Sequence, residues 1–285
     1  MALGKGVIPA RFKRESIDRD PRLKHSGMTW VRGGTLKMLI PIWLPLVFFL
    51  IALIYSMMGF GGGSSYLAFL VLAGLNHQEI PPVALVCNLI VTLGGVWYFH
   101  RGGHLRIEKI LPFVIFSIPM AYLGGRIMIG KELFSFLLGL SLFVVGLRML
   151  LPDKLFEHSK PVSTRKVWAV GLPLGGVLGF LSGLVGIGGG IFLSPLLLLL
   201  RWVGVKEAAA AASLFIAVNS LAGLVGQLEK GTFDFTLILP LGLAVLIGGQ
   251  IGSRIGSYYL PKLRLQQMTA GLILYVSLRL LWGLV

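Results

Sequence analysis

Two glycine clusters are the groups in this sequence whose type and spacing could bind a ligand. Gly59-Phe60-Gly61-Gly62-Gly63 recurs 127 positions later as Gly186-Ile187-Gly188-Gly189-Gly190, each time inside a long apolar run. A glycine inside a helix costs about 1 kcal/mol relative to alanine, so four in five residues predict a helix break. The N–H groups that start the next half-helix lie at its positive dipole end and suit an anion. We therefore predict that both clusters bind substrate, with hydroxyl donors from Ser64 and Ser65.

The alternative for these glycines is close helix packing, because small residues let backbones approach one another in membranes. That alternative explains spaced glycines such as Gly242 and Gly248 well, and it explains the two clusters poorly. A break at membrane depth survives only where protein or a water-filled cavity covers it. Paired breaks at matching places in two halves indicate a transporter's substrate site.

Two asparagines follow the glycine clusters at matching places. Asn88 and Asn219 each lie near the middle of an apolar run, where an amide is costly unless it is paired. One interpretation is structural: a hydrogen bond between helices, or one to a carbonyl freed by the glycine break. The other is a direct donor to the ligand. Both interpretations stay open, and we predict that both asparagines belong to the substrate site.

Arg126 and Arg254 directly follow Gly-Gly and Gly-Ser at the end of the third apolar run of each half. A long basic side chain at this place can reach the lipid headgroups while its stem stays in the apolar region. Alternatively, the two arginines attract an anionic substrate toward the pathway.

The apolar runs carry no central carboxylate. All 11 acids and all five histidines fall in the N-terminal segment, in connections or at helix ends. Intramembrane carboxylates mark proton relays and cation pathways, so their absence favours an anion. The sequence also has no phosphate-binding loop, metal-ligand cluster or nucleophile with a base. We therefore predict no catalytic residue, no metal and no cofactor.

Composition predicts a membrane protein. Of the 285 residues, 55% are hydrophobic and 13% charged, whereas soluble domains carry about 25% charged residues. Nine of the 26 basic residues lie in the first 40 positions, a distribution that orients a membrane protein rather than binding nucleic acid. We predict a multi-pass protein of the inner (plasma) membrane, with lipid as a partner. Residues 1–37 are predicted to be a basic cytoplasmic extension without a cleaved signal peptide.

The apolar runs predict an all-α integral membrane protein with about eight transmembrane helices. These form two homologous four-helix repeats, 38–151 and 167–285, joined by a polar linker at 152–166, and the first helix of each repeat is broken at its glycine cluster. The predicted spans are 39–58 continuing to 75, 82–99, 109–128, 132–151, 167–186 continuing to 201, 207–228, 235–256 and 263–284.

Further matches between the halves support duplication. Pro112 matches Pro240, Gly124-Gly125-Arg126 matches Gly252-Ser253-Arg254, and Leu147–Leu150 matches Leu278–Leu281. Basic residues in the N-terminal segment, at Arg101–Lys109 and at Lys154–Lys166 favour a cytoplasmic N-terminus with four crossings per half, and hence parallel repeats. If each break is instead a full hairpin, the number of segments per half becomes odd and the repeats are inverted.

The paired glycine breaks, the asparagine that follows each, the arginine that closes the third helix and the duplicated layout resemble the sulfite exporter TauE/SafE family, over about residues 38–285. The resemblance implies a membrane permease for small anions such as sulfite or organosulfonates, sulfoacetate among them. Two departures distinguish the halves: Pro119 faces Ile247 in the alignment, and Ser64-Ser65 face Ile191-Phe192.

We therefore predict a secondary transporter that exports a small sulfur-containing anion through a central site between the repeats. A monovalent anion that leaves a cell at 100 mV, negative inside, gains about 2.3 kcal/mol, which could drive export. A passive anion channel is one alternative, and flux that does not saturate would favour it. An intramembrane lipid-modifying enzyme is another, and it would need an acid, base or nucleophile placed near the bilayer.

Overall fold

The computed structural model describes residues 28–30, 36–38, 43–75, 77–150, 162–230 and 235–258, with 274–275, 277–278 and 281–282. The chain divides into two compact units, Met1–Leu44 and Pro45–Val285. In the first unit, β1 (Met28–Trp30) pairs antiparallel with β2 (Leu36–Met38). The sequence did not predict this short strand pair. In the second unit, every described element is a helix, as the sequence predicted.

The helices follow the apolar runs closely. In chain order they are α3 (Trp43–Met57), α4 (Gly63–Leu72), α5 (Ile80–Arg101), α6 (Ile107–Arg126), α7 (Lys131–Leu150), α8 (Thr164–Val185), α9 (Gly190–Leu199), α10 (Val205–Leu228) and α11 (Phe235–Tyr258). Among the described residues, α5, α6, α8, α10 and most of α11 are long and apolar enough to cross a membrane. The predicted span 263–284 lies largely outside the described residues, as does most of the linker.

Helix α8 begins inside the predicted linker because a serine caps its first turn. The Oγ of Ser163 accepts a hydrogen bond from the N–H of Lys166 at 3.4 Å. Serine is a preferred N-cap, since its side chain satisfies one of the N–H groups that have no partner within the helix. The helix therefore starts at Thr164, three residues before the predicted start of this span at 167.

Each glycine cluster reverses the chain. Helix α4 packs back along α3, with the rings of Tyr66 and Phe48 stacked at a centroid distance of 4.5 Å. The second cluster turns the same way, since a Cβ built on Gly189 would lie 3.1 Å from the carbonyl oxygen of Leu178 in α8. The interpretation as four simple crossings per half therefore does not fit the geometry, and the hairpin alternative does.

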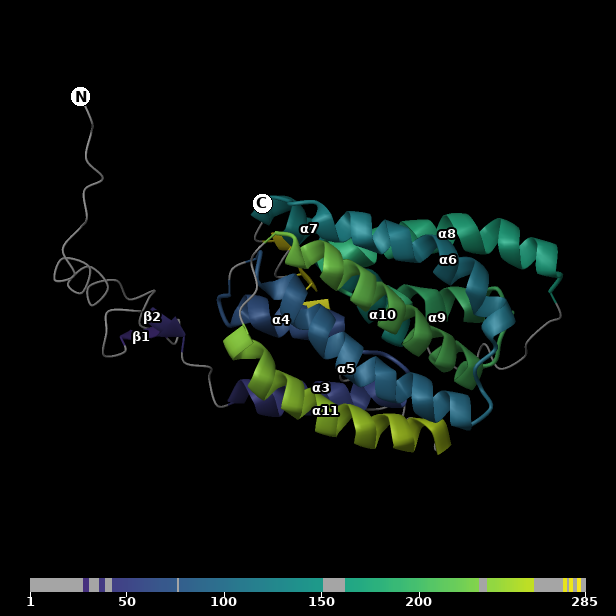
Figure 1. Cartoon of the computed structure of the whole chain (residues 1–285), viewed down its shortest axis with the longest axis horizontal. Coiled ribbons are helices and arrows are strands. Elements are labelled where there is room, and N and C mark those ends of the chain that lie inside the picture. The colour runs from purple at the N-terminus through teal and green to yellow at the C-terminus, as the bar shows by residue number, and fades with distance from the viewer. Residues whose placement is uncertain are drawn as a thin grey trace, which may run out of the picture. The chain divides into compact units, whose positions relative to one another are not determined.

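Two sets of helices run in opposite directions. Helices α6, α8 and α10 share one direction, and α3, α5 and α11 share the other; α5 and α10 meet antiparallel between the sets. In Figure 1, α6 and α8 lie side by side along one edge, α3 and α11 along the other, with α5 and α10 between them. Glycine contacts set these registers: Gly175 to Phe113, Gly183 to Ala121, Gly248 to Phe49, Gly256 to Met57, Gly249 to Val91, Gly95 to Ser213 and Gly223 to Leu85.

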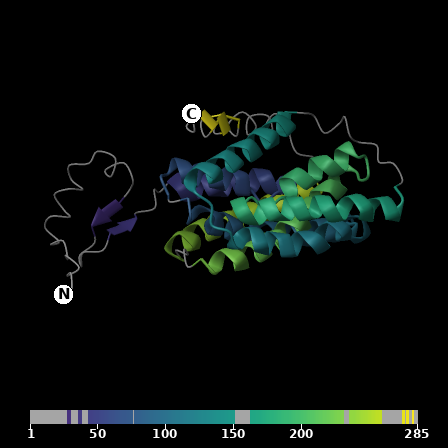
Figure 2. The same cartoon turned by 90° about the horizontal axis from the view of Figure 1, so that it is seen from above.

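Small residues make these close contacts because two backbones can approach where neither carries a large side chain. Without a hydrophobic driving force between helices in lipid, packing of this kind holds a bundle together. The view from above in Figure 2 shows α7 running obliquely across the bundle. The helix glycines at these contacts therefore have the packing role that the sequence analysis gave as the alternative.

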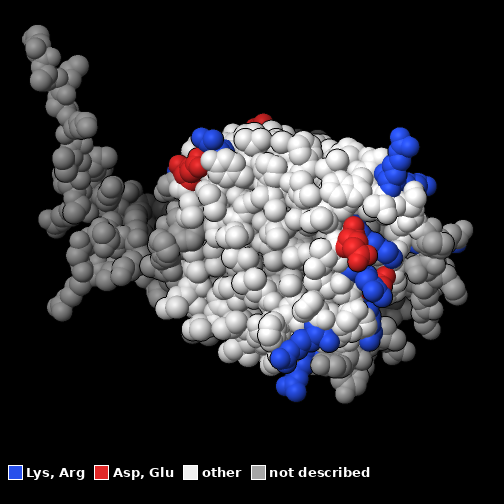
Figure 3. Space-filling model, turned by 45° about the vertical axis from the view of Figure 1, so that its right-hand side comes forward, with Lys and Arg blue, Asp and Glu red and all other residues white. Residues whose placement is uncertain are grey.

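Basic side chains gather at one end of the bundle, where α5 and α11 end and α6, α8 and α10 begin. Figure 3 shows charged groups toward the ends and a broad uncharged surface between them. Charges of both signs lie at the opposite, balanced end, with Arg126 and Lys230 against Glu79, Glu132 and Glu229. The basic end carries Arg101, Arg106, Lys109, Arg165, Lys166, Arg201, Lys206 and Arg254 against Glu108 and Glu207.

His104, in the loop between α5 and α6 at the basic end, should make folding stability depend on pH. Burial, and then the charge of Lys206, lower the pKa of His104 from 6.5, against an opposite effect of Glu207. The folded protein therefore binds a proton less readily than the unfolded chain. Its stabilising effect is complete above pH 6.5 and is lost as the pH falls through the folded-state pKa. We expect the melting temperature in detergent to fall on acidification, and to fall less in His104→Gln; an equal fall in both proteins would contradict this.

Candidate functional site

The two glycine clusters meet at the side chain of Asn88. This residue of α5 is fully buried, and its Nδ2 donates to the carbonyl oxygen of Ile187 in the second cluster at 3.1 Å. From the first cluster, a Cβ on Gly63 would lie 2.9 Å from Oδ1 of Asn88. From the second, a Cβ on Gly188 would lie 3.0 Å from Nδ2. Segments 99 residues apart are thus joined through one amide.

Two helix N-termini converge on this point. Gly62 caps α4 at φ 91° and Gly189 caps α9 at φ 74°, and neither helix has a side-chain cap. Left-handed backbone of this kind is open to glycine at little cost, which is why the sequence keeps glycine at both caps. The first N–H groups of an α-helix have no partner within the helix, and the dipole adds partial positive charge there. The arrangement can bind an anion without a charged side chain.

Each cluster begins by packing against the other half of the chain. A Cβ on Gly59 would lie 2.8 Å from Cα of Ala209 in α10, and one on Gly186 would lie 2.8 Å from Cα of Pro81 in α5. Gly61 lies against the side chain of Asn88, and Gly190 against α10 at Ile216. The structure therefore brings these four glycines against α5 or α10.

Several buried polar atoms near the clusters have no partner among the described residues. They include Oδ1 of Asn88, Oγ of Ser182 and Oγ of Ser220. A Cβ on Gly188 would lie 3.2 Å from the Ser220 hydroxyl, and one on Gly189 would lie 3.2 Å from Cβ of Ser182. Buried polar groups in native proteins are nearly always hydrogen-bonded, so these atoms are candidates to meet a ligand or water.

The buried polar side chains of the described segments are serine, threonine, asparagine and glutamine, with no acid or base among them. Nor do the residues that the structure describes form a group of three or more His, Cys, Asp or Glu that could hold a metal ion. Such an interior offers amide and hydroxyl groups to a ligand, and no fixed negative charge opposes an anion.

Ser64 and Ser65 lie buried in the first turn of α4, directly after the first cluster. The Ser65 hydroxyl donates to the Tyr55 hydroxyl in α3 at 2.7 Å, so it links the two arms of the hairpin. In the second half Ile191 and Phe192 occupy the equivalent positions, so this polar link is confined to the first half.

Asn219 differs from its counterpart in what it contacts. Its Nδ2 donates to the carbonyl oxygen of Phe215, four residues earlier in the same helix, at 2.8 Å. Its Oδ1, like that of Asn88, is buried without a partner in the described part of the chain. Of the two interpretations drawn from the sequence, the hydrogen bond of Asn88 matches the bond to a carbonyl freed by the break. The amide oxygen of Asn88, which has no partner among the described residues, can meet a ligand.

The structure does not bring the two arginines to Asn88. Arg126 lies at the end of α6 with its side chain 52% exposed, and its Nε is 2.7 Å from a carboxylate oxygen of Glu229. The negative charge of Glu229 therefore partly compensates that of Arg126. The same carboxylate also accepts a hydrogen bond from the hydroxyl of Tyr122 at 2.6 Å. Arg254 lies exposed on α11 near the opposite end of the bundle.

Polar residues of α10 that the sequence analysis passed over also support the clusters. The Ser213 hydroxyl donates to the carbonyl oxygen of Gly59 at 2.8 Å, and Nε2 of Gln227 donates to that of Gly183 at 3.0 Å. Ser220 directly follows Asn219. Each of these residues is a polar side chain inside an otherwise apolar run. That contrast is the signal by which the sequence indicates a polar contact, and the mean hydropathy of the run hides it.

Comparison with known proteins agrees with this geometry. The model of the family described as "Sulfite exporter TauE/SafE" matches residues 44–280. The chain is 34% identical over 244 residues to a probable membrane transporter protein, y4hK, of Sinorhizobium fredii, covering 85% of this chain and 98% of that protein. It is 26% identical to the probable membrane transporter protein YunE of Bacillus subtilis, covering 77% and 89%. No solved structure gives a significant match. A family match over most of the chain and a relative similar over its whole length lead to one conclusion: this is a membrane transporter protein that belongs to the sulfite exporter TauE/SafE family.

Proposed function

We propose that the protein is a permease of the inner (plasma) membrane that exports a small sulfur-containing anion, sulfite or an organosulfonate. Its substrate site lies where the two glycine clusters meet at Asn88. The observation that carries the proposal is the buried Asn88 amide. Its Nδ2 donates to the carbonyl oxygen of Ile187 at 3.1 Å, and its oxygen, without a partner among the described residues, lies beside two helix N-termini that have no side-chain cap. Partial positive charge and neutral donors suit an oxyanion.

The two halves act, on this proposal, as inverted repeats, 38–151 and 167–285, behind an N-terminal extension of residues 1–37. Contacts recur with the halves exchanged: Gly62 lies against Ile51 as Gly189 lies against Leu178. The equivalent helices α5 and α10 run antiparallel, which favours a two-fold axis in the membrane plane. Transporters built this way bind substrate at the interface of the repeats and expose it alternately to the two sides.

The directions of the helices constrain the orientation in the membrane. The sequence analysis placed the N-terminal segment and the connection from Arg101 to Lys109 on the same, cytoplasmic side. Because α3 and α5 run in the same direction, α3 starts at the end opposite to Arg101, and only one of these basic regions can be cytoplasmic. The cytoplasmic N-terminus therefore stays a prediction, and it implies that the basic end of the bundle faces outward.

Transport of labelled sulfite into proteoliposomes tests the proposal, with sulfoacetate and taurine as competitors and imposed potential and pH gradients. We expect saturable uptake that responds to the membrane potential, because a translocated monovalent anion exchanges about 2.3 kcal/mol with a 100 mV potential. Vesicles without protein give the background. Flux that rises linearly with concentration would support the passive channel, and folded protein without flux of any oxyanion would remove the substrate assignment.

A further inference from the structure

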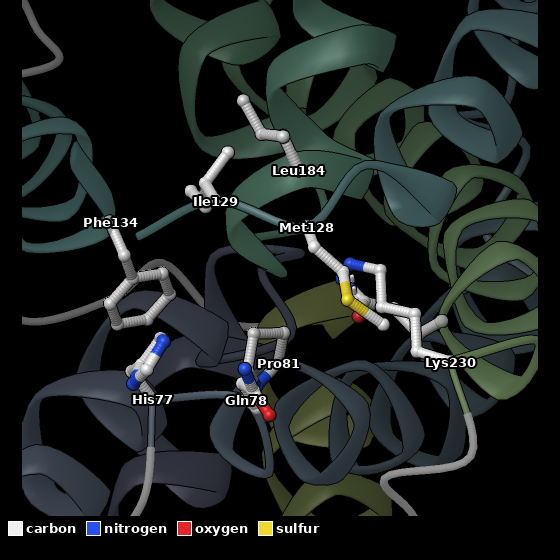
Figure 4. A pocket seen from close by; sticks show the side chains of 9 residues that line it. His77, Gln78, Pro81, Met128, Ile129, Phe134, Leu184 and Lys230 are labelled. Atoms are coloured by element: carbon white, nitrogen blue, oxygen red, sulfur yellow. Dashed lines mark hydrogen bonds between the residues drawn. The ribbon is translucent and has the colours of Figure 1, made fainter. Parts of the chain in front are cut away.

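A pocket opens at the balanced end of the bundle, where α5 begins and α6, α8 and α10 end. Figure 4 shows Met128 and Lys230 together on one side of it and His77 beside Phe134 on the other. Its lining includes Pro81, Met128, Leu184, Gln227 and Lys230.

The pocket lies next to the second glycine cluster. Pro81 lines it and also packs against Gly186, whose Cβ position lies 2.8 Å from Cα of Pro81. Leu184, another lining residue, is the penultimate residue of α8 and lies two residues before the cluster. Gln227 lines the pocket as well and donates to the carbonyl oxygen of Gly183 at 3.0 Å. An anion in the pocket would therefore be separated from the proposed site by the turn of the cluster itself.

Lys230 is the cation of this pocket. Its Nζ donates to the carbonyl oxygen of Ile127 at 2.7 Å and to Oε1 of Gln227 at 3.0 Å. An ammonium has three N–H donors, and within the part of the chain that the structure describes no carboxylate takes the third. The neighbouring Glu229 pairs with Arg126 instead. Burial lowers the pKa of Lys230, since its ammonium is partly removed from water.

We propose that this pocket is a vestibule in which Lys230 holds a small oxyanion before or after it occupies the site at Asn88. A half-buried ammonium with a donor to spare attracts an anion more strongly than a fully solvated one, because fewer waters screen it. The vestibule rests on the proposed function for its physiological substrate, and its attraction for anions can be measured without transport. It also replaces Arg126 as the cation on this side, since Arg126 already has a carboxylate partner.

Anion attraction is measured with a thiol in the pocket. Met128→Cys in a Cys87→Ala background gives one reactive thiol, because Cys87 is the sole cysteine of the chain and Met128 is 63% exposed. The purified full-length protein is treated with a sulfonate-bearing and with a trimethylammonium-bearing methanethiosulfonate. The readout is the rate of modification by the sulfonate reagent divided by the rate with the trimethylammonium reagent. We expect this ratio to fall on the order of tenfold in Lys230→Met, to be retained in Lys230→Arg and to be unchanged in Arg126→Gln. An unchanged ratio in Lys230→Met overturns the vestibule.

Transport kinetics give the second readout. In proteoliposomes, Lys230→Met should raise the KM for labelled sulfite about tenfold with Vmax retained, and Lys230→Arg should restore the KM. A lower Vmax with an unchanged KM would overturn the vestibule, because it indicates a structural role for Lys230. A changed thiol ratio without sulfite transport supports the vestibule and removes the proposed substrate, so the two failures are distinguishable.

Discussion

Asn88→Ala should reduce saturable sulfite uptake at least about tenfold while leaving a folded protein. The substitution removes the one hydrogen bond that the carbonyl oxygen of Ile187 accepts among the described residues, and with it an amide oxygen that has no partner among them. A buried polar group left without its partner costs about 1–3 kcal/mol, which corresponds to about 5- to 150-fold in an equilibrium constant. We expect the loss because this amide holds the two clusters in register. Initial rates of uptake and the melting temperature are measured on the same preparations.

Two variants serve as matched controls for Asn88→Ala. Thr92→Val removes a hydroxyl that donates to the carbonyl oxygen of Asn88 within α5, at 2.7 Å, and should leave uptake within about twofold. Asn219→Ala removes a bond within α10 only, so we expect a smaller loss than for Asn88→Ala. Equal losses of uptake in Asn88→Ala and Asn219→Ala would show that the hydrogen bond to Ile187 contributes nothing specific to transport.

Gly188→Ala should abolish uptake and lower the free energy of unfolding. Gly188 has φ 88°, and a left-handed residue with a Cβ costs about 1–2 kcal/mol. In addition, the new Cβ would lie 2.7 Å from Cγ2 of Ile216, 3.0 Å from Nδ2 of Asn88 and 3.2 Å from Oγ of Ser220. The polar atoms of the proposed site must move to make room, so we expect a loss of uptake beyond what the strain explains.

Gly74→Ala separates strain from crowding. Gly74 has φ 81°, close to that of Gly188, but a Cβ built on it meets nothing within 4 Å. This variant should therefore lose about 1–2 kcal/mol of stability and keep its uptake. Thermal unfolding in detergent and uptake in proteoliposomes are compared for the two variants. If Gly74→Ala loses uptake as completely as Gly188→Ala, backbone strain alone accounts for the effect.

The prediction of the helices succeeded because its signals are local. The apolar runs predicted α5 at 82–99 and α10 at 207–228, and the structure has Ile80–Arg101 and Val205–Leu228. Glycine breaks a helix wherever four of five residues lack side chains, so both interruptions could be placed from the sequence. The resemblance to the TauE/SafE family rested on the same local motifs and is confirmed by the family match.

The directions in which successive helices run could not be predicted in the same way. A break in an apolar run fits a kink as well as a hairpin, and the distribution of basic residues favoured the kink. The hairpin follows from contacts such as Tyr66 on Phe48, and these depend on side-chain packing across the turn rather than on hydropathy. The short strand pair at Met28–Met38 was missed because its strands have three residues each and no clear alternation.

By itself the sequence determined that this is a helical membrane protein with two matched glycine breaks, each followed by an asparagine inside an apolar run. Hydropathy, glycine and repeat length act over a few residues and are legible in order along the chain. The tertiary structure alone decided that both breaks meet at Asn88, that Asn219 bonds within its own helix and that Arg126 pairs with Glu229. The first and third of these contacts join segments about 100 residues apart. All three depend on which helices pack together, because residues brought together by packing leave no periodic signal in the chain.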